Sequence, residues 1–325
     1  MIDSHGTAGY RLGRISVASL ALAATLSVLS PREAAARAGC PEPPQTAAAL
    51  DARSPYQPGS NAKSKDNAAF NEAANAGING FIVDIERLAD AAMGGDGGAA
   101  ECFGTTMTKW VKTAPMTETL SGQATLQQQW FLSAIALATI KARAGGARLS
   151  PEVERWFRTV SDGVRAYQDA RQFKNNLAAW AALAVGATAY LLRDDDGWRW
   201  AMGRQSLMVD QIQPDGVLPK ELARGPRASS YHVFAAMPLF ATSLIQSCRG
   251  GVDAGQADRL QRLGGLLRSI QQDPQFLAAR AGSEQFPAKA MPAVTALQGG
   301  GPQNYFEDKL GGNITNLRQA LSRCR

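Results

Sequence analysis

Apolar residues recur along most of this chain at the three- and four-residue spacing of amphipathic helices, and regularly alternating β-branched runs do not occur. Glycine-, proline- and aspartate-rich turns separate the helical segments. The pattern predicts helices at residues 66–93, 99–114, 123–144, 151–170, 174–193, 197–213, 227–248 and 254–282. Helices of this length with short connections indicate packed helical pairs, so we predict an all-α fold, either an (α/α) toroid or an incomplete barrel of helical hairpins.

The first residues have the features of a secretory signal. Arginines precede an apolar run at residues 15–29, and Ala36 to Ala38 has the small-x-small pattern that a signal peptidase accepts. The run is short against the roughly 20 residues that span a bilayer, which disfavours the alternative of a membrane anchor. We predict a signal peptide over residues 1–38 and a single domain over 39–325, exported to the periplasm without stable membrane insertion.

The cysteines Cys40, Cys102, Cys248 and Cys324 all follow the predicted cleavage site. An even count in an exported protein indicates disulfides, and the sequence permits three pairings. We favour Cys40 with Cys102 and Cys248 with Cys324. No CxxC spacing occurs, so a metal or redox role for the cysteines is disfavoured.

Basic residues exceed acidic ones, which gives the chain a formal net charge of +6. This excess favours polyanionic partners modestly, through long-range steering. Nucleic acid is a poor candidate, because the protein is predicted to be exported and carries no long basic run or recognised binding motif.

Histidine is scarce, since the chain has two and His5 lies in the predicted signal peptide. The mature protein would keep only His232, which excludes a zinc site built on several histidines and leaves one imidazole for any triad. His232 directly follows Tyr231, and Arg224 precedes both. A phenol has an unperturbed pKa of about 10, and nearby guanidinium groups favour its ionised form. The grouping therefore suits removal of a proton from a carbon beside a carboxylate.

Several landmarks occur in the same order as in one known family, and together they cover about residues 40 to 317. They are Cys102, Trp110, Trp130, Trp156-Phe157, Asn175-Asn176 with Trp180, the stretch from Leu218 to His232, Asp273-Pro274 with Phe276 to Ala279, and Leu310 to Thr315. On these residues the chain resembles the periplasmic alginate lyase family of polysaccharide lyases, in which an (α/α) toroid degrades mannuronate-rich polymers.

The resemblance implies β-elimination at a uronic acid, in which a base removes the C5 proton and the C4 oxygen leaves. The carboxylate must be neutralised to make that proton acidic enough. By resemblance, Arg224 and Asn176 match the neutralising pair, and Tyr231 matches the tyrosine that acts as acid and is the candidate base. His232 is either an auxiliary group or a structural neighbour of Tyr231.

Substrate-binding residues are predicted with less support. Lys63 and Lys65 lie where the family has a substrate-contacting lysine, and the local alignment does not choose between them. Further candidates are Asn175, Arg227, Trp110 and Trp180, although aromatic residues at helical spacing are more often part of the core.

One position departs from the family. Where the family has a histidine after the second asparagine, this chain has Leu177, whose side chain neither donates nor accepts a hydrogen bond. Three explanations stay open. Tyr231 performs both proton transfers, His232 supplies part of the missing role, or the protein has kept the groove and lost the reaction.

We therefore expect an exported polysaccharide lyase that cleaves a β-1,4-linked uronate polymer, either alginate or polymannuronate or a glucuronan-like polymer. We expect no metal, no cofactor and a monomer, with the anionic polysaccharide as partner. The alternative is a non-catalytic uronan-binding protein with a degenerate site. A hydrolase is a weaker option, because it needs two positioned carboxylates, and sequence spacing does not establish the separation of Asp210, Asp215 and Glu221.

Overall fold

The computed structural model describes residues 39–44, 76–118, 120 and 122–324. The predicted signal peptide and the two candidate lysines, Lys63 and Lys65, lie outside these ranges. The long helices follow the predicted order: α2 (Ala76–Met93), α3 (Gly97–Val111), α4 (Gly122–Ala144), α5 (Pro151–Arg171), α6 (Asn176–Leu192), α7 (Asp195–Val209), α9 (Ala228–Ser247) and α10 (Ala254–Gln272). The helical pattern is thus confirmed over these segments.

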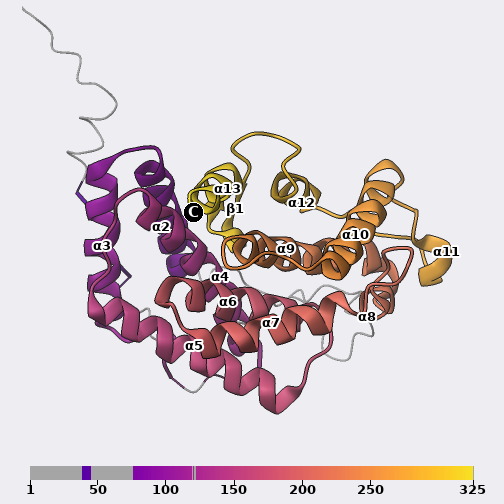
Figure 1. Cartoon of the computed structure of the whole chain (residues 1–325), viewed down its shortest axis with the longest axis horizontal. Helices are drawn as coiled ribbons and strands as arrows, with labels where there is room; N and C mark the ends of the chain where they lie inside the picture. The colour runs from indigo at the N-terminus through magenta and orange to yellow at the C-terminus, as the bar shows by residue number, and fades with distance from the viewer. Residues whose placement is uncertain (1–38, 45–75, 119, 121, 325) are drawn as a thin grey trace, which may run out of the picture.

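Helices adjacent in sequence pack against one another as pairs, in the arrangement of an incomplete toroid. Figure 1 shows α2 and α3 at one end of the molecule, α5 along the lower edge, and α6 and α7 between α5 and α9. The most extensive packing joins α6 to α7, α4 and α9, and α2 to α4. The core is formed between these helices, and α6 lies at its centre.

The sequence of α6 explains its central place. Nearly every residue from Ala178 to Ala189 is buried, and the helix is apolar on all sides. A helix without a polar face is stable only when protein surrounds it, and its many alanines let neighbouring helices approach closely. Gly186 packs directly on α7, where an added Cβ would lie 3.4 Å from the Ala201 side chain.

The segment Gly225–Ser247, which contains α9, is long and apolar enough to cross a membrane by length and composition. However, 72% of its most apolar window is buried inside the structure. Burial against α6 and α12 (Met291–Leu297) accounts for the apolar character of this segment as that of a core helix.

The predicted helix at 254–282 is wrong after residue 272. α10 ends at Gln272, and only the single turn α11 (Ala278–Ala281) follows. Pro274 explains the break, because proline disfavours helical geometry in the preceding residue and lacks the N–H that a helix interior needs.

A short hairpin near the C-terminus was not predicted. β1 (Phe306–Glu307) pairs antiparallel with β2 (Gly312–Asn313), with the turn η4 (Asp308–Leu310) between them, and α13 (Ile314–Ser322) follows. Gly311 has a φ of +77°, and a Cβ there would lie 2.7 Å from the backbone nitrogen of Ala138 in α4. The glycine is therefore required both by its backbone conformation and by close approach to α4.

A buried polar cluster ties this hairpin to the core. The Lys141 ammonium pairs with Asp90, whose carboxylate also accepts from the Asn313 backbone at 3.0 Å and the Asn316 amide at 3.0 Å. Glu86 lies nearby, and burial raises its pKa well above the ordinary value. The cluster holds α2, α4 and α13 together, and Glu86 is favoured in its neutral form.

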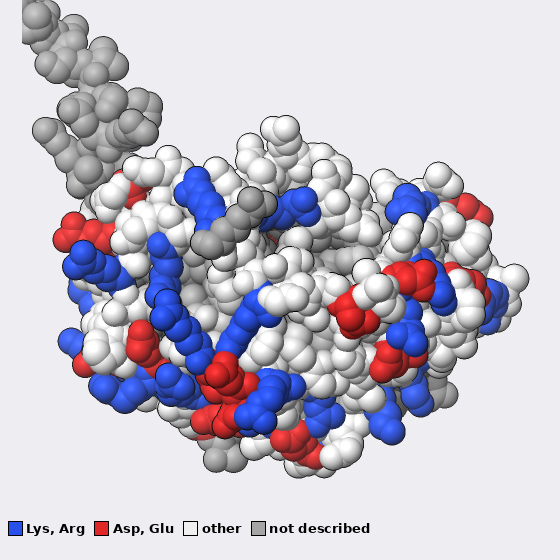
Figure 2. Space-filling model, viewed as in Figure 1, with Lys and Arg blue, Asp and Glu red and all other residues white. Residues whose placement is uncertain are grey.

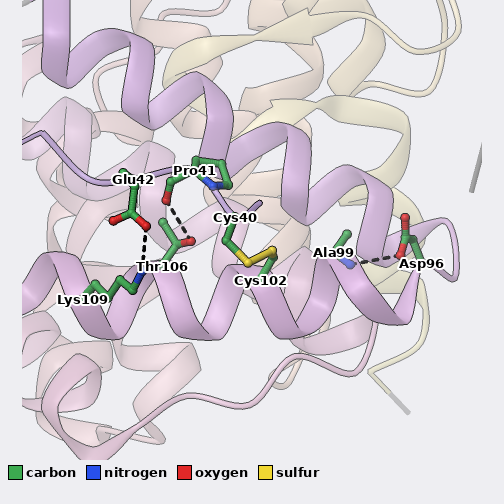
Figure 3. Close-up of a disulfide and its surroundings, with 8 residues drawn as sticks. All are labelled: Cys40, Pro41, Glu42, Asp96, Ala99, Cys102, Thr106 and Lys109. Atoms are coloured by element: carbon green, nitrogen blue, oxygen red, sulfur yellow. Dashed lines mark hydrogen bonds and ion pairs between the residues drawn. A yellow bond between two sulfur atoms is a disulfide. The ribbon is translucent and has the colours of Figure 1, made fainter. Parts of the chain in front are cut away.

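Both predicted disulfides are confirmed. Cys40 pairs with Cys102 across a Cα separation of 5.3 Å, and Cys248 pairs with Cys324 across 5.6 Å. Figure 3 shows the first of these holding residues 40–42 against α3, where Thr106 donates to the Pro41 carbonyl at 3.3 Å. The second disulfide joins the end of α9 to the residues after α13.

Candidate active site

The first part of the site is built where α6 begins. Asn175 caps the helix, because its side-chain oxygen accepts from the Leu177 N–H at 3.1 Å. The next residue, Asn176, is 1% exposed and donates twice to Glu221, from its backbone nitrogen at 2.6 Å and from Nδ2 at 3.0 Å. Asn175 therefore starts the helix, and Glu221 fixes the orientation of Asn176.

Glu221 belongs to the single turn α8 (Pro219–Leu222), and Arg224 follows it. The Nε of Arg224 lies 3.6 Å from a Glu221 oxygen, and the guanidinium carbon lies 4.7 Å from the centre of the Tyr231 ring. Gly225 between them has a φ of +57°, which lets the chain turn sharply into η3 (Gly225–Arg227) and α9. The structure thus brings the predicted residues Asn176, Arg224 and Tyr231 to one place.

The link between them is Glu221, which sequence reasoning considered only as a hydrolase carboxylate. Its side chain is 0% exposed. Burial raises its pKa, while the Asn176 hydrogen bonds and the Arg224 charge oppose that shift. The Glu221 carboxylate contacts Asn176 and Arg224, so its role in the described structure is to position these two residues. Its spacing of three residues before Arg224 was the available signal, since that spacing suits an ion pair on a helical turn.

His232 is structural in this geometry. It is 0% exposed, its Nδ1 lies 2.8 Å from the Ala228 carbonyl oxygen, and its Nε2 accepts from the Leu218 N–H at 3.0 Å. Burial lowers the pKa of His232 to about 4. The prediction that His232 is catalytic is therefore not supported, because both ring nitrogens are occupied and the ring is held neutral beneath the site.

A second segment supports the turn that carries Arg224 and Tyr231. Gln285 is 3% exposed, accepts from the Ser229 N–H at 3.0 Å and donates to the Gly225 carbonyl at 3.0 Å. Phe286 donates from its backbone to the Pro226 carbonyl at 2.7 Å. The sequence analysis did not predict this contact, because no local pattern indicates it.

Comparison with known proteins identifies the family of this chain. A family model described as alginate lyase matches residues 46–273, which is more than half of the chain. The chain belongs to the alginate lyase family. It is accordingly a polysaccharide lyase, and membership implies an anionic polysaccharide substrate.

Two relatives agree with this assignment. A polysaccharide lyase of Stenotrophomonas maltophilia is 28% identical and aligns with 75% of this chain and 80% of its own length. An alginate lyase of Pseudomonas fluorescens is 30% identical and aligns with 75% of this chain and 69% of its own length. Neither the structure nor these comparisons support the alternative of a non-catalytic binding protein.

Solved structures support the fold. Alginate lyase A1-III from Sphingomonas species A1 superposes with a TM-score of 0.62 and 15% identity, covering 85% of each chain. A histidine-to-alanine variant of A1-III complexed with tetrasaccharide gives a TM-score of 0.64 and 16% identity, covering 86% of this chain and 84% of its own. The likeness confirms the (α/α) toroid.

Leu177, where the alginate lyase family has a histidine, is half-buried beside the start of α6. Its carbonyl accepts from the Gln168 side chain at 3.3 Å, and Gln168 also donates to Gln129 at 2.9 Å. Both glutamines are buried. The Leu177 carbonyl therefore contacts a neutral amide, and neither glutamine supplies a titratable group.

Two tryptophans predicted to bind substrate lie in the core instead. Trp110 is 0% exposed and packs between Phe81 and Trp156, with ring centres 5.0 and 5.2 Å away. Trp180 is also 0% exposed and lies behind Phe234, whose ring centre is 5.0 Å from it. Neither ring face is open to a sugar. Phe234 packs edge-on against Tyr231 at 6.4 Å, so Trp180 supports Tyr231 indirectly.

The remaining predicted residue is Arg227, whose guanidinium carbon lies 5.2 Å from the centre of the Phe286 ring, next to the Gln285 contact. It is half-buried at the same turn as Arg224. Within the described part of the chain, no group of three His, Cys, Asp or Glu side chains is arranged to hold a metal ion.

Proposed function

We propose that this member of the alginate lyase family cleaves a β-1,4-linked polyuronate, at a mannuronate or glucuronate residue, by β-elimination without a metal ion. The observation that supports this most directly is the connected group formed by Asn176, Glu221, Arg224 and Tyr231. It combines a fixed cation, an amide donor and a phenol, the three kinds of group that the reaction requires.

Arg224 and Asn176 bind the substrate carboxylate in this proposal. The Glu221 contacts use one Nδ2 hydrogen of Asn176 and leave the second for the substrate. Charge that develops beside the carboxylate when C5 loses its proton is stabilised by Arg224, which stays protonated. Because Glu221 holds both groups before substrate arrives, little reorganisation is needed during the reaction.

Tyr231 performs both proton transfers. Its ionised oxygen removes the C5 proton, the electron pair of the C5–H bond forms the C4–C5 double bond, and the C4–O bond breaks. The phenol then returns the proton to the leaving oxygen. One group can serve both atoms only if they lie on the same face of the sugar, which is the syn geometry of mannuronate and glucuronate. Leu177 and the occupied ring of His232 supply no competing base.

The test is incubation of the purified protein with polymannuronate, glucuronan and hyaluronan while the ultraviolet absorbance of the conjugated product is followed. Activity should appear with at least one polymer, persist with a chelator, and disappear in Tyr231→Phe. Tyr167→Phe is the matched control, because Tyr167 packs on Phe173 at 5.9 Å and is not part of the connected group. Binding of all three polymers without absorbance would overturn the proposed reaction.

Leu177→His addresses the departure from the family. If the groove has been kept and the reaction lost, the wild-type chain is inactive and the restored imidazole gives activity. The proposal instead expects the wild-type chain to turn over substrate already, with Tyr231 indispensable both with and without the histidine.

We also propose that the protein is exported to the periplasm and acts there as a monomer. The signal-like segment supports export, and the two disulfides are typical of an oxidising compartment. N-terminal sequencing of the periplasmic protein should find Gly39 as the first residue, and sedimentation should give the mass of one chain. Protein retained in the cytoplasm with residues 1–38 intact would contradict this.

A further inference from the structure

A cavity of about 660 Å³ opens between the ends of helices that also carry the active site. It is lined by residues at the C-terminal ends of α4 and α6 and by residues that follow α9 and α13. The active site lies at the opposite, N-terminal ends of α6 and α9. At a rise of 1.5 Å per residue, the 17 residues of α6 separate the two sites by about 25 Å.

Arginine dominates the lining of this cavity. Arg143, Arg193, Arg249 and Arg323 all border it, and none of the described lining residues is acidic. Figure 2 shows several Lys and Arg side chains below the position of α13 in Figure 1, with Asp and Glu side chains at their lower end. We call this cavity the arginine pocket.

Partners within the protein neutralise only part of this charge. Arg143 donates to the Leu191 carbonyl at 2.8 Å, and Arg249 pairs with Asp195. No side-chain hydrogen bond or ion pair of Arg193 or Arg323 joins either to another residue in the part of the chain described. The pocket therefore keeps an excess of positive charge.

The neighbouring acids at the start of α7 are committed elsewhere. Asp194 caps that helix by accepting from the backbone of Asp196 and Gly197, both at 3.1 Å, and Asp196 pairs with Arg199. Arginine does not lose its proton in proteins, so a bound anion would reduce the mutual repulsion of the arginines in the pocket.

The chemistry of the lining indicates which anion fits. Guanidinium groups bind carboxylates through paired hydrogen bonds. Tyr190, Leu191 and Ile140 add apolar surface, which suits a sugar ring between its charged groups. The volume lies within the range of about 300–1,000 Å³ that is usual for small-molecule sites.

We infer that the arginine pocket is a second binding site for the anionic polysaccharide or its oligosaccharide product, distinct from the active site and contacting the carboxylates of successive uronate residues. This rests on the proposed function for the identity of the sugar. A polymer held at both sites dissociates more slowly than one held at a single site, because each contact keeps the other end nearby.

The test uses Arg193→Asn with Arg323→Gln, since asparagine tolerates the left-handed backbone of residue 193, where φ is 54°. The control is Arg155→Gln with Arg158→Gln, two exposed arginines of α5 that give the same change of net charge. Each pair is combined with Tyr231→Phe, so that the bound sugar is not consumed.

Calorimetric titration with mannuronate and glucuronate tetrasaccharides should find two sites per chain in Tyr231→Phe and in the control, and one in the pocket variant. A neutral tetrasaccharide should not bind to the arginine pocket. Two sites retained in the pocket variant would overturn the inference, as would inorganic phosphate that fills the second site as tightly as the sugar.

Turnover by the pocket variant and the control with Tyr231 unchanged gives an independent readout. The pocket variant should raise KM for long polymer about tenfold, leave KM for the tetrasaccharide unchanged, and leave kcat unchanged. A KM for long polymer that is the same in the pocket variant and in the control would contradict the inference without affecting the lyase proposal. A protein that binds two tetrasaccharides but forms no unsaturated product would contradict the lyase proposal alone.

Discussion

Replacement of Glu221 by glutamine is the most direct test of how the active site is held. Glu221 is fully buried, accepts two hydrogen bonds from Asn176 and lies 3.6 Å from the Arg224 guanidinium. Glutamine has nearly the same shape, but the two Asn176 donors bind different oxygens of Glu221, and in glutamine an NH2 group takes the place of one of these oxygens and must face a donor or a cation. One buried donor therefore loses its partner.

An unsatisfied buried donor costs about 1–3 kcal/mol. If Asn176 and Arg224 shift and stabilise the transition state less by this amount, kcat falls about 10- to 100-fold, since 1.36 kcal/mol corresponds to a tenfold change. KM should change less, because the substrate carboxylate keeps Arg224. Glu221→Gln should also lower the free energy of unfolding by a similar amount.

The assay is steady-state turnover of the preferred polymer, with the unfolding free energy measured on the same preparations. Asp258→Asn is the matched control, because Asp258 is exposed and pairs only with Arg262 on the surface of α10. In the double variant Glu221→Gln with Asn176→Ala, the two losses should not add, since they act through one contact. A folded Glu221→Gln protein with wild-type kcat, or losses that add fully, would refute the reasoning.

Three further predictions concern groups around the site and in the core. Gln285→Ala removes the hydrogen bonds to Ser229 and Gly225, so kcat should fall about tenfold for a loss of roughly 1–3 kcal/mol, whereas Gln272→Ala at the exposed end of α10 should not change kcat. The pKa of His232 is lowered from 6.5 to about 4, so between these pH values the unfolded chain binds a proton that the folded chain does not. The free energy of unfolding should therefore fall by about 3 kcal/mol as pH drops from 6.5 to 4. Urea unfolding should show this slope in the wild type and not in His232→Asn; equal slopes would contradict the burial argument. Burial raises the pKa of Glu86 in the folded protein, so its contribution to the free energy of unfolding is lost as pH rises above the ordinary pKa of a glutamate. Glu86→Gln should therefore lower stability less at pH 8 than at pH 5, and a larger loss at pH 8 would show that the ionised form is the one stabilised.

The helices were predictable because their signals are local. Apolar spacing and turn residues determine where α4, α5 and α6 lie, and Pro151 in the first turn of α5 fits its start in the structure. The same local signals include Pro274, which marks the true end of α10. The presence of disulfides was also predictable, whereas the sequence left three pairings open and the structure shows the favoured one.

The contacts that hold the site were not predictable in the same way. Glu221 meets Asn176 across 45 positions of sequence, and Gln285 meets Ser229 across 56. No spacing rule connects residues so far apart, and a buried carboxylate or amide looks like a surface one in a sequence. The tryptophans show the converse, because a core indole and a sugar-binding indole have the same local pattern, and only burial separates Trp180 from a substrate contact.

The two ends of α6 and α9 place different electrostatic demands on their surroundings. The N-terminal ends carry partial positive charge, which favours a carboxylate near Asn176 and Tyr231, so a single arginine beside the phenol is enough to complete the site. The C-terminal ends carry partial negative charge, and an anion there is bound only if cations outweigh it. The arginine pocket has four such cations, and only Arg143 donates to a helix-terminal carbonyl among the contacts described. If these arginines served only to cap the carbonyls at the helix ends, fewer than four would be enough. The additional arginines are what a second carboxylate-bearing ligand would need, and salt should weaken binding at the pocket more than at the half-buried Arg224.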